Sequence, residues 1–170
     1  EPAAGDNGLA LGCAYYGWLE VLNKQKVKHN ENTCFGKAYP EEELKAVLNA
    51  RPAGFHVEKL NSEELTTETA RFLAEGLTVG WFRDHCEFGP RALGHRSILA
   101  HPGISGLGDH INANIKFRED FRPFAPAVLP EWATAYFRSG RKSPYMILID
   151  HTKPEYLDQL QNVTHVNGTA

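Results

Sequence analysis

Short helical and extended patterns alternate along the whole chain, and this alternation constrains the fold more than any other feature. Helical periodicity and helix-start residues predict helices at 6–23, from 40 onward, and at 62–75, 106–115 and 130–137. Short apolar or alternating runs predict strands at 55–60, 78–82, 97–100, 125–129, 144–150 and 163–166. Elements in this order predict an α/β fold, on the border with α+β, built around a mixed sheet.

Capping and turn-forming residues mark the ends of several elements. Asp6 is expected to cap the first helix and Ser62 the third, because short polar side chains accept hydrogen bonds from the free N–H groups at a helix start. Pro40 suits the first turn of a helix, and Gly76 suits the end of one. Residues 24–38 are polar and lack any period, so they predict a linker.

Composition places the chain among ordinary globular proteins, with 42% hydrophobic and 23% charged residues. The net charge of -3 gives no global basic field of the kind that drives non-specific nucleic-acid binding, so an anion site must be local. No apolar run approaches the roughly 20 residues of a membrane-spanning helix. We therefore expect neither a nucleic-acid partner nor a membrane partner.

The cysteines Cys13, Cys34 and Cys86 are odd in number and show no C-x-x-C spacing. This pattern argues against a disulfide framework and against a thiolate zinc site. The first residues also lack the basic and apolar regions of a signal peptide. The expected location is the cytoplasm, where thiols stay reduced.

Six basic residues gather beside glycines, prolines and short elements in the middle of the chain. They are Arg83, Arg91, Arg96, Lys116, Arg118 and Arg122. Guanidinium groups bind phosphate oxygens in pairs, and an ammonium group acts as a movable point charge, so the mixture suits a ligand with several phosphoryl groups. In an extended segment, an i and i+2 pair such as Lys116 and Arg118 would share one face.

Two other interpretations of this region stay open or are disfavoured. The basic residues could instead be surface charges paired with the acidic residues Glu87, Asp109, Glu119 and Asp120. The histidines at 85, 95, 101 and 110 lack the spacing of helical metal ligands, which favours structural roles for them. The sequence contains no P-loop, no dinucleotide-binding glycine motif and no nucleophile elbow.

Two long motifs carry a resemblance to a known family. The sequences EFGPRALGHRSIL at 87–99 and IKFREDFRPFAP at 115–126 closely resemble the NodU-type O-carbamoyltransferases of nodulation-factor and antibiotic biosynthesis. The likeness continues at 2–12 and at 163–170. It implies that residues 1–38 are the end of an upstream actin/sugar-kinase-like domain plus a linker. Residues 39–170 would form a YrdC-like domain, truncated at its C-terminus, with three layers and a twisted mixed sheet flanked by helices.

The resemblance also implies a reaction. The YrdC-like domain would bind ATP and carbamoyl phosphate and form carbamoyl-adenylate, and the upstream domain of the same polypeptide would pass the carbamoyl group to a small-molecule hydroxyl. Mg²⁺ would accompany ATP, and Fe²⁺ or another divalent metal would belong to the upstream domain. The alternatives are a non-catalytic nucleotide-binding module and a domain of the threonylcarbamoyl-adenylate type that acts in transfer-RNA modification.

Individual residues take expected roles from the matched motifs. The catalytic set is Lys116, Arg118 and Arg96, the substrate- and nucleotide-binding set is Arg91, Ser97, Arg122 and Asn167, and Asp6 would hold metal in the full-length protein. His95 and Asn167 depart from the family pattern, in which Asn and Asp are common at these positions.

Overall fold

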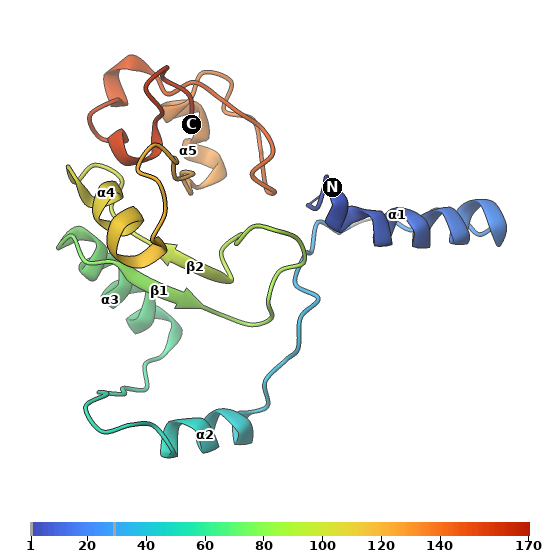
Figure 1. Cartoon of the computed structure of the whole chain (residues 1–170), viewed down its shortest axis with the longest axis horizontal. Coiled ribbons are helices and arrows are strands. Elements are labelled where there is room, and N and C mark those ends of the chain that lie inside the picture. Colours follow the sequence, from blue (N-terminus) through green and yellow to red (C-terminus); the bar gives the residue numbers. More distant parts are fainter. Residues whose placement is uncertain (1, 29) are drawn as a thin grey trace. The chain divides into compact units, whose positions relative to one another are not determined.

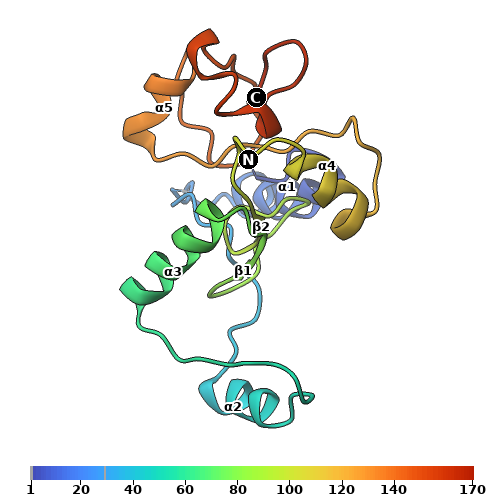
Figure 2. The ribbon, with the colours of Figure 1, turned by 90° about the vertical axis from the view of Figure 1, so that its left-hand side faces the viewer.

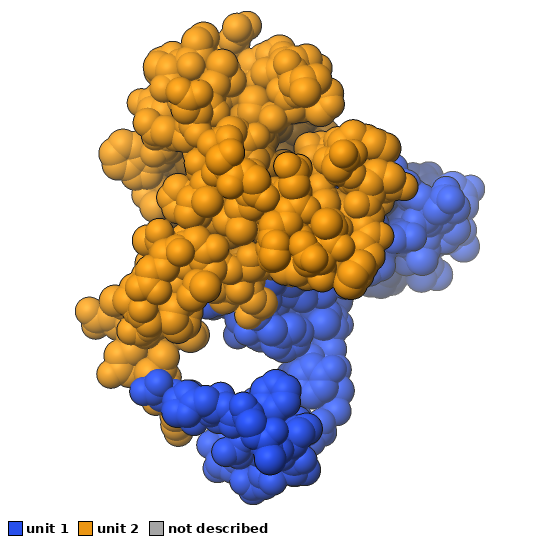
Figure 3. Space-filling model, turned by 60° about the vertical axis from the view of Figure 1, so that its left-hand side comes forward, with its two compact units in different colours: residues 1–58, 81–97 blue, residues 59–80, 98–170 orange. Residues whose placement is uncertain are grey.

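The computed structural model describes residues 2–28 and 30–170. Two compact units make up the chain, each from two segments of sequence (Figure 3). Unit 1 contains residues 1–58 and 81–97, and unit 2 contains residues 59–80 and 98–170. The boundary expected near residue 38 concerns an upstream domain and stays a prediction.

Unit 1 begins with a helical segment and continues to a second, separate helix. A 3-10 turn at Asp6–Gly8 leads into α1, Leu9–Tyr16, which continues as a π-helical segment at Gly17–Val21. The helix α2 spans Glu41–Asn49 and carries three glutamates in its first turn, where they favour the positive end of the helix dipole. Both predicted helices are confirmed.

The cap expected from Asp6 is wrong. Gly5 precedes the 3-10 turn and Gly8 precedes α1, and neither start has a hydrogen bond from a capping side chain. Asp6 instead lies within the first turn and is exposed. A carboxylate there still interacts favourably with the helix dipole, but it accepts no N–H.

The strand predicted at 55–60 is also wrong. The segment carries no strand, and Phe55 and Val57 are 66% and 42% exposed. Alternation alone does not make a strand, because backbone N–H and C=O groups must find a partner strand.

Two short antiparallel strands form the one sheet of the described residues (Figure 1). The strand β1 spans Val79–Phe82 and β2 spans Arg96–Leu99. Both agree with the prediction to within one residue at each end. A further bond from the N–H of Arg83 to the oxygen of His95, at 2.9 Å, follows the paired strands.

The helix α3, Ser62–Ala74, has well-defined signals at both ends. Asn61, not Ser62, is the cap: its side chain accepts from the N–H groups of Glu63 and Glu64, and the Glu64 carboxylate accepts from the Asn61 N–H. Ser62 already has helical backbone, so the capping role moves one residue back. Gly76 ends the helix as predicted, in the left-handed conformation at φ 83°.

Unit 2 continues with short helices. The helix α4, Leu107–Ile111, runs into a π-helical turn at Asn112–Lys116, and α5 spans Pro130–Tyr136 with proline at its start. These confirm the helices predicted at 106–115 and 130–137. Two 3-10 turns follow at Pro154–Tyr156 and Gln161–Val163.

Three strands predicted in unit 2 are wrong, each for a local reason. In 125–129, Pro126 lacks the N–H that a ladder needs. In 144–150, Met146 has a left-handed backbone at φ 54°, which breaks an extended run. In 163–166, the chain closes a turn in which Gly168 donates to the oxygen of His165 at 2.8 Å.

Isolated bridges replace these strands in the C-terminal part of unit 2. Phe137 pairs with Thr152, and His151 pairs with Thr169. Both ribbon views show the C-terminal segment beside α5 (Figures 1 and 2). The Asp150 carboxylate fixes the turn after α5 by accepting from the Ser139 hydroxyl at 2.5 Å and from the Gly140 N–H at 2.9 Å.

The ionisation of Asp150 reflects these contacts. Burial alone raises the pKa of its carboxyl group, but hydrogen bonds from the Ser139 hydroxyl and from the N–H groups of Ser139, His151 and Gly140 outweigh burial and lower the pKa to about 2. The carboxylate is therefore charged whenever the fold is intact near neutral pH.

Packing in the described residues is light. Five hydrophobic residues are buried, and none of the large side chains is completely enclosed. The helices and the two-stranded sheet confirm a mixed α/β class. The larger twisted sheet expected from the resemblance is not among the described elements. No helix in residues 2–28 or 30–170 is both long and apolar enough to span a bilayer.

Candidate functional site

The first cationic segment, named the 87–97 loop, covers the second part of the connection between the two strands and the first two residues of β2, and it belongs to unit 1. Gly89 and Gly94 both have a left-handed backbone, at φ 105° and 101°. Glycine adopts this conformation without the steric penalty of a Cβ atom. At Gly89 a Cβ would also lie 3.2 Å from the carbonyl oxygen of Pro2. The two glycines therefore set the curvature of the loop.

Glu87 lies at the centre of this loop, and its side chain is 0% exposed. One carboxylate oxygen, Oε1, accepts from the N–H groups of Leu93 and His95, both at 2.7 Å. The other, Oε2, accepts from Nε of Arg96 at 3.1 Å. Three donors from the far side of the loop thus converge on one buried carboxylate.

These contacts decide the charge of Glu87. Burial alone raises the pKa of its carboxyl group, but hydrogen bonds from Leu93, His95 and the Arg96 side chain outweigh burial and hold the pKa below its ordinary value. Glu87 is therefore ionised at neutral pH, and it compensates the charge of Arg96.

Arg96 is bound mainly to its own loop. Besides Glu87 Oε2, its Nη2 donates to the carbonyl oxygens of Glu87 at 3.4 Å and Gly89 at 3.2 Å. Next to it, the Ser97 hydroxyl accepts from the N–H of Gly94 at 3.1 Å. Arg96, predicted as catalytic, and Ser97, predicted to bind the ligand, thus brace the loop.

Arg91 and Arg83 differ in whether their side chains have a bonding partner. Arg91 is exposed, and no hydrogen bond or ion pair of its side chain is found within the described part of the chain. Arg83 pairs with its neighbour Asp84 at 2.9 Å. Arg91 is therefore the arginine of this loop whose guanidinium is available to a ligand.

A segment of unit 1 supports the start of the loop. Phe88 donates its N–H to the oxygen of Thr33 at 2.6 Å, and Gly36 donates to the oxygen of Cys86 at 3.1 Å. The ring Nδ1 of His85 lies 2.6 Å from the oxygen of Gly36. These contacts fix the chain directly before and after Glu87.

The second cationic segment, the 116–124 loop, follows the π-helical turn in unit 2. The expectation of an extended pair at Lys116 and Arg118 is wrong, because Phe117 between them has a left-handed backbone at φ 47°. Lys116 is exposed, and no hydrogen bond or ion pair of its side chain occurs among the residues that the structure describes. Arg118 instead turns toward its own loop.

Asn112 lies at the centre of the 116–124 loop and is 2% exposed. Its Oδ1 accepts from Nε of Arg118 at 2.6 Å. Its Nδ2 donates to the carbonyl oxygens of Asp120 at 3.3 Å and Arg122 at 3.2 Å. One neutral amide therefore holds an arginine and two backbone carbonyls. The Arg118 guanidinium also lies over the ring of Phe124, 4.7 Å from its centre.

Arg118 remains charged at neutral pH. Burial, and then repulsion from Arg122, lower the pKa of Arg118, but an arginine starts so high that it keeps its proton. Arg122 forms a loose ion pair with Glu119, 3.8 Å apart, with both side chains more than half exposed. Arg122 and Lys116 therefore stay accessible.

Asn167 lies in the C-terminal turn of unit 2. Its Oδ1 accepts from the N–H and the hydroxyl of Thr169, at 3.1 and 2.7 Å, so the amide stabilises its own turn. Asp6 lies in unit 1, and no group of three potential metal-ligating side chains exists in residues 2–28 and 30–170.

The predicted site residues thus fall into two sets. Arg91, Arg96, Ser97 and Asp6 belong to unit 1, and Lys116, Arg118, Arg122 and Asn167 belong to unit 2. Each cationic loop is described by itself. Within each loop, one basic residue is held inward and another is left free.

Two residues that organise the loops were not predicted as site residues. The alternative that the basic residues pair with acidic neighbours is confirmed for Arg96 with Glu87 and for Arg122 with Glu119. A carboxylate among glycines and arginines was the available signal. Nothing in the sequence pointed to Asn112.

An amide also holds the glycine-rich segment at 103–108. The Asn162 side chain accepts from the N–H of Gly108 at 3.0 Å and donates to the oxygens of Pro102 and Ile104 at 2.9 and 2.6 Å. This segment precedes Asn112 and helps to fix α4.

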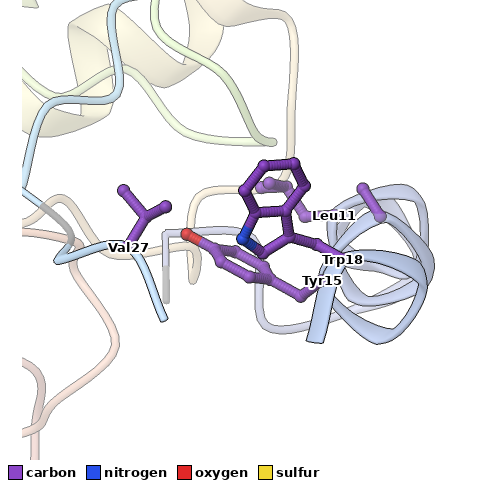
Figure 4. Close-up of a pocket in the computed structure, with 5 residues that line it drawn as sticks. Leu11, Tyr15, Trp18 and Val27 are labelled. Carbon is purple, nitrogen blue, oxygen red and sulfur yellow. The ribbon is translucent and has the colours of Figure 1, made fainter. Parts of the chain in front are cut away.

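An apolar hollow lies on the first helix of unit 1 (Figure 4). It is lined by Leu11, Ala14, Tyr15, Trp18 and Val27 and has a volume of about 410 Å³. The Trp18 indole N–H donates to the oxygen of Gln25 at 2.9 Å, which folds the following segment back over the helix. No charged side chain lines the hollow, so it does not suit a phosphate.

Comparison with known proteins identifies relatives of this chain. The chain is 37% identical over 174 residues to nodulation protein NolNO of Sinorhizobium fredii, with 100% of the chain and 25% of the relative covered. It is 36% identical over 174 residues to nodulation protein NolO of Bradyrhizobium diazoefficiens, covering 100% and 31%. Nodulation protein U of Rhizobium fredii is 40% identical over 170 residues, covering 99% and 27%.

The chain spans about a quarter of the length of the curated relatives that it matches. A family model described as carbamoyltransferase C-terminus matches residues 70–170, which is more than half of the chain and includes both cationic loops. The chain therefore belongs to the carbamoyltransferase C-terminus family.

Proposed function

We propose that this chain binds carbamoyl phosphate and ATP and forms carbamoyl-adenylate, which a further domain of the polypeptide uses to carbamoylate a small-molecule hydroxyl. The observation that carries the proposal is the presence of two braced loops, each with a free cation, in a member of a carbamoyltransferase family. Fixed loops with free Arg and Lys side chains suit ligands that bear several phosphoryl groups.

The reaction requires positive charge at defined places. Carbamoyl phosphate first gives up its phosphate to water and leaves carbamate. A carbamate oxygen then attacks the α-phosphorus of ATP, the bond to the β-phosphate oxygen breaks, and pyrophosphate leaves. Negative charge develops on the α-phosphoryl oxygens and on the leaving group, and preorganised cations stabilise it.

The basic residues divide this work according to their contacts. In the 87–97 loop, the exposed Arg91 contacts a phosphoryl group, and Arg96, bound to Glu87, holds the loop that presents it. In the 116–124 loop, the exposed Lys116 contacts a phosphoryl group with support from Arg122, and Arg118, held by the neutral Asn112, contributes fixed positive charge. Fixed charge in a partly buried position acts over a longer range than the same charge in water.

Mg²⁺ fits this scheme as a companion of ATP. Mg²⁺ is usually held by phosphate oxygens with one or two carboxylates and keeps several waters, so it does not need a cluster of protein ligands. The amide of Asn167 is the proposed polar group on the protein side, and Asp6 is proposed separately to hold metal in the complete polypeptide. A metal of the upstream domain, Fe²⁺ or another divalent ion, remains part of the proposal.

The finer expectations about fold and location belong to the same proposal. We assign residues 39–170 to a YrdC-like domain. The reaction takes place in the cytoplasm, in keeping with three cysteines that are free thiols.

A pyrophosphate-release assay tests the proposal. The chain is incubated with Mg²⁺, ATP and carbamoyl phosphate, each omitted in turn, and pyrophosphate is measured. Release should require both substrates and should fall about tenfold or more in Lys116→Ala, because a charge-assisted contact is lost. Lys24→Ala removes another exposed lysine, which lies outside both loops, and serves as the control. Saturable binding of both ligands without pyrophosphate would instead indicate a nucleotide-binding module without turnover.

A further inference from the structure

We propose that Glu87 is a positioning residue for this reaction: it holds the 87–97 loop so that Arg91 meets the phosphorylated substrate, and Arg96 acts through the loop rather than on the ligand. The identity of the ligand rests on the proposed function. The assignment of Glu87, and the division of roles between Arg91 and Arg96, go beyond it.

The first step of the argument is the burial of Glu87. A carboxylate with 0% side-chain exposure must be compensated by donors, because an unpaired buried charge is strongly destabilising. Here the donors are the N–H groups of Leu93 and His95 and Nε of Arg96. With both oxygens occupied by the loop, Glu87 has no evident role in bond making.

The second step is the way Arg96 closes the loop. Its guanidinium binds the Glu87 carboxylate and the carbonyl oxygens of Glu87 and Gly89 at the same time. It therefore joins the end of the loop to its beginning. A lysine could not make this set of contacts, because it lacks the planar fork of donors.

The third step concerns the residue that the closed loop presents. Arg91 lies between Gly89 and Gly94, the two left-handed glycines, and it is exposed. A fixed backbone on both sides of Arg91 lowers the ordering cost of binding an anion. The carboxylate, the bridging arginine and the two glycines thus form one device that presents Arg91.

Glu87→Gln tests this device with an almost isosteric change. The amide oxygen can still accept from the backbone, but the charge that holds Arg96 is gone. Hydrogen exchange followed by NMR should show the amides of Leu93 and His95 exchanging about tenfold or more faster, with exchange in α3 and α5 unchanged. Glu43→Gln, which removes an exposed carboxylate paired with Lys37, is the matched control and should leave the loop unchanged.

Binding supplies the second readout. Glu87→Gln should weaken carbamoyl phosphate binding about tenfold, and adding Arg91→Ala to it should weaken binding little further, because both changes remove the same contact. If the double variant loses affinity by the product of the two single losses, the two residues act independently and the proposal is overturned. Unchanged exchange at Leu93 and His95 would overturn it as well.

Two further outcomes are informative. If Glu87→Gln also raises exchange in α3 and α5, the substitution has destabilised more than the loop, and Arg96→Lys is measured instead. Faster exchange confined to the 87–97 loop in Arg96→Lys supports the proposal. Unchanged exchange there contradicts it. If the wild-type chain does not bind carbamoyl phosphate, the proposed function fails, and loop exchange in the variants still decides whether Glu87 holds the loop.

Discussion

A charged side chain organises one of the two cationic loops, and a neutral side chain organises the other. The 87–97 loop closes around the buried carboxylate of Glu87, which accepts from two backbone N–H groups and from Arg96. The 116–124 loop closes around the buried amide of Asn112, which accepts from Arg118 and donates to two backbone carbonyls. Both arrangements hold one arginine inward and leave another cation exposed.

This difference determines how sensitive each loop is to substitution and to pH. A carboxylate only accepts, so the 87–97 loop must turn its N–H groups inward, and left-handed glycines make that turn possible. An amide accepts and donates, so the 116–124 loop can turn carbonyls inward and needs no charge at its centre. We therefore expect the first loop to be more sensitive to substitution and to pH.

The largest expected effect comes from removing each central side chain. Glu87→Ala leaves a guanidinium and two N–H groups without their acceptor and should lower the free energy of unfolding by about 2–4 kcal/mol. Asn112→Ala frees two carbonyls that can turn to water and should cost about 1–2 kcal/mol. Urea denaturation measures both, with Glu43→Ala as the control. An equal or larger loss for Asn112→Ala would contradict the comparison.

The left-handed positions give a second, smaller contrast. Gly94→Ala puts a Cβ atom on a backbone at φ 101° with no atom within 4 Å, so conformational strain alone should cost about 1–2 kcal/mol. Phe117→Gly relieves the same kind of strain at φ 47° and removes an exposed ring, so it should be neutral or stabilising. Thermal unfolding of both variants tests this, and a clear loss of stability in Phe117→Gly would show that the ring is needed.

The pH dependence separates the loops further. Because the pKa of Glu87 is held below its ordinary value, its contribution to stability is complete above about pH 4.5 and is lost as the pH falls through the lower, folded value. Asn112 has no such dependence. Unfolding midpoints between pH 3 and 6 should therefore fall less steeply in Glu87→Gln than in the wild-type chain. Parallel curves would mean that Glu87 is not the group responsible.

The smallest effect is expected at the exposed ion pair of the second loop. Glu119 and Arg122 lie 3.8 Å apart with side chains 61% and 54% exposed. Solvent screens such pairs, so Glu119→Gln should change the free energy of unfolding by less than about 0.5 kcal/mol. Double-mutant analysis with Arg122→Gln measures the coupling directly, and a coupling above about 1 kcal/mol would show that this loop also depends on charge.

The sequence predicts those parts of the fold that local chemistry decides. The glutamates of α2, the glycine after α3 and the proline at the start of α5 each act within one turn of chain, and the helices appear where expected. The strand predicted at 144–150 is wrong because Met146 has a left-handed backbone at φ 54°. The strand predicted at 55–60 is wrong because a strand depends on a distant partner. Alternating residues reveal no such partner.

The same limit applies to the candidate site. Arginines among glycines predicted a cationic loop, since side-chain type carries the chemistry. Which arginine faces inward depends on distances that the sequence does not contain: Arg96 lies 3.1 Å from a buried carboxylate, whereas Arg91 is free. The role of Asn112 was equally hidden, because its partners Asp120 and Arg122 contribute only backbone atoms.

Calorimetric titration tests the central claim most directly. The wild-type chain is titrated with carbamoyl phosphate and with ATP plus Mg²⁺, and the titrations are repeated with Arg91→Ala, Lys116→Ala and the control Lys24→Ala. The account predicts saturable binding that weakens about tenfold or more in Arg91→Ala and Lys116→Ala and is unchanged in the control. Binding by both loop variants with wild-type affinity, or no binding by a folded wild-type chain, would contradict it.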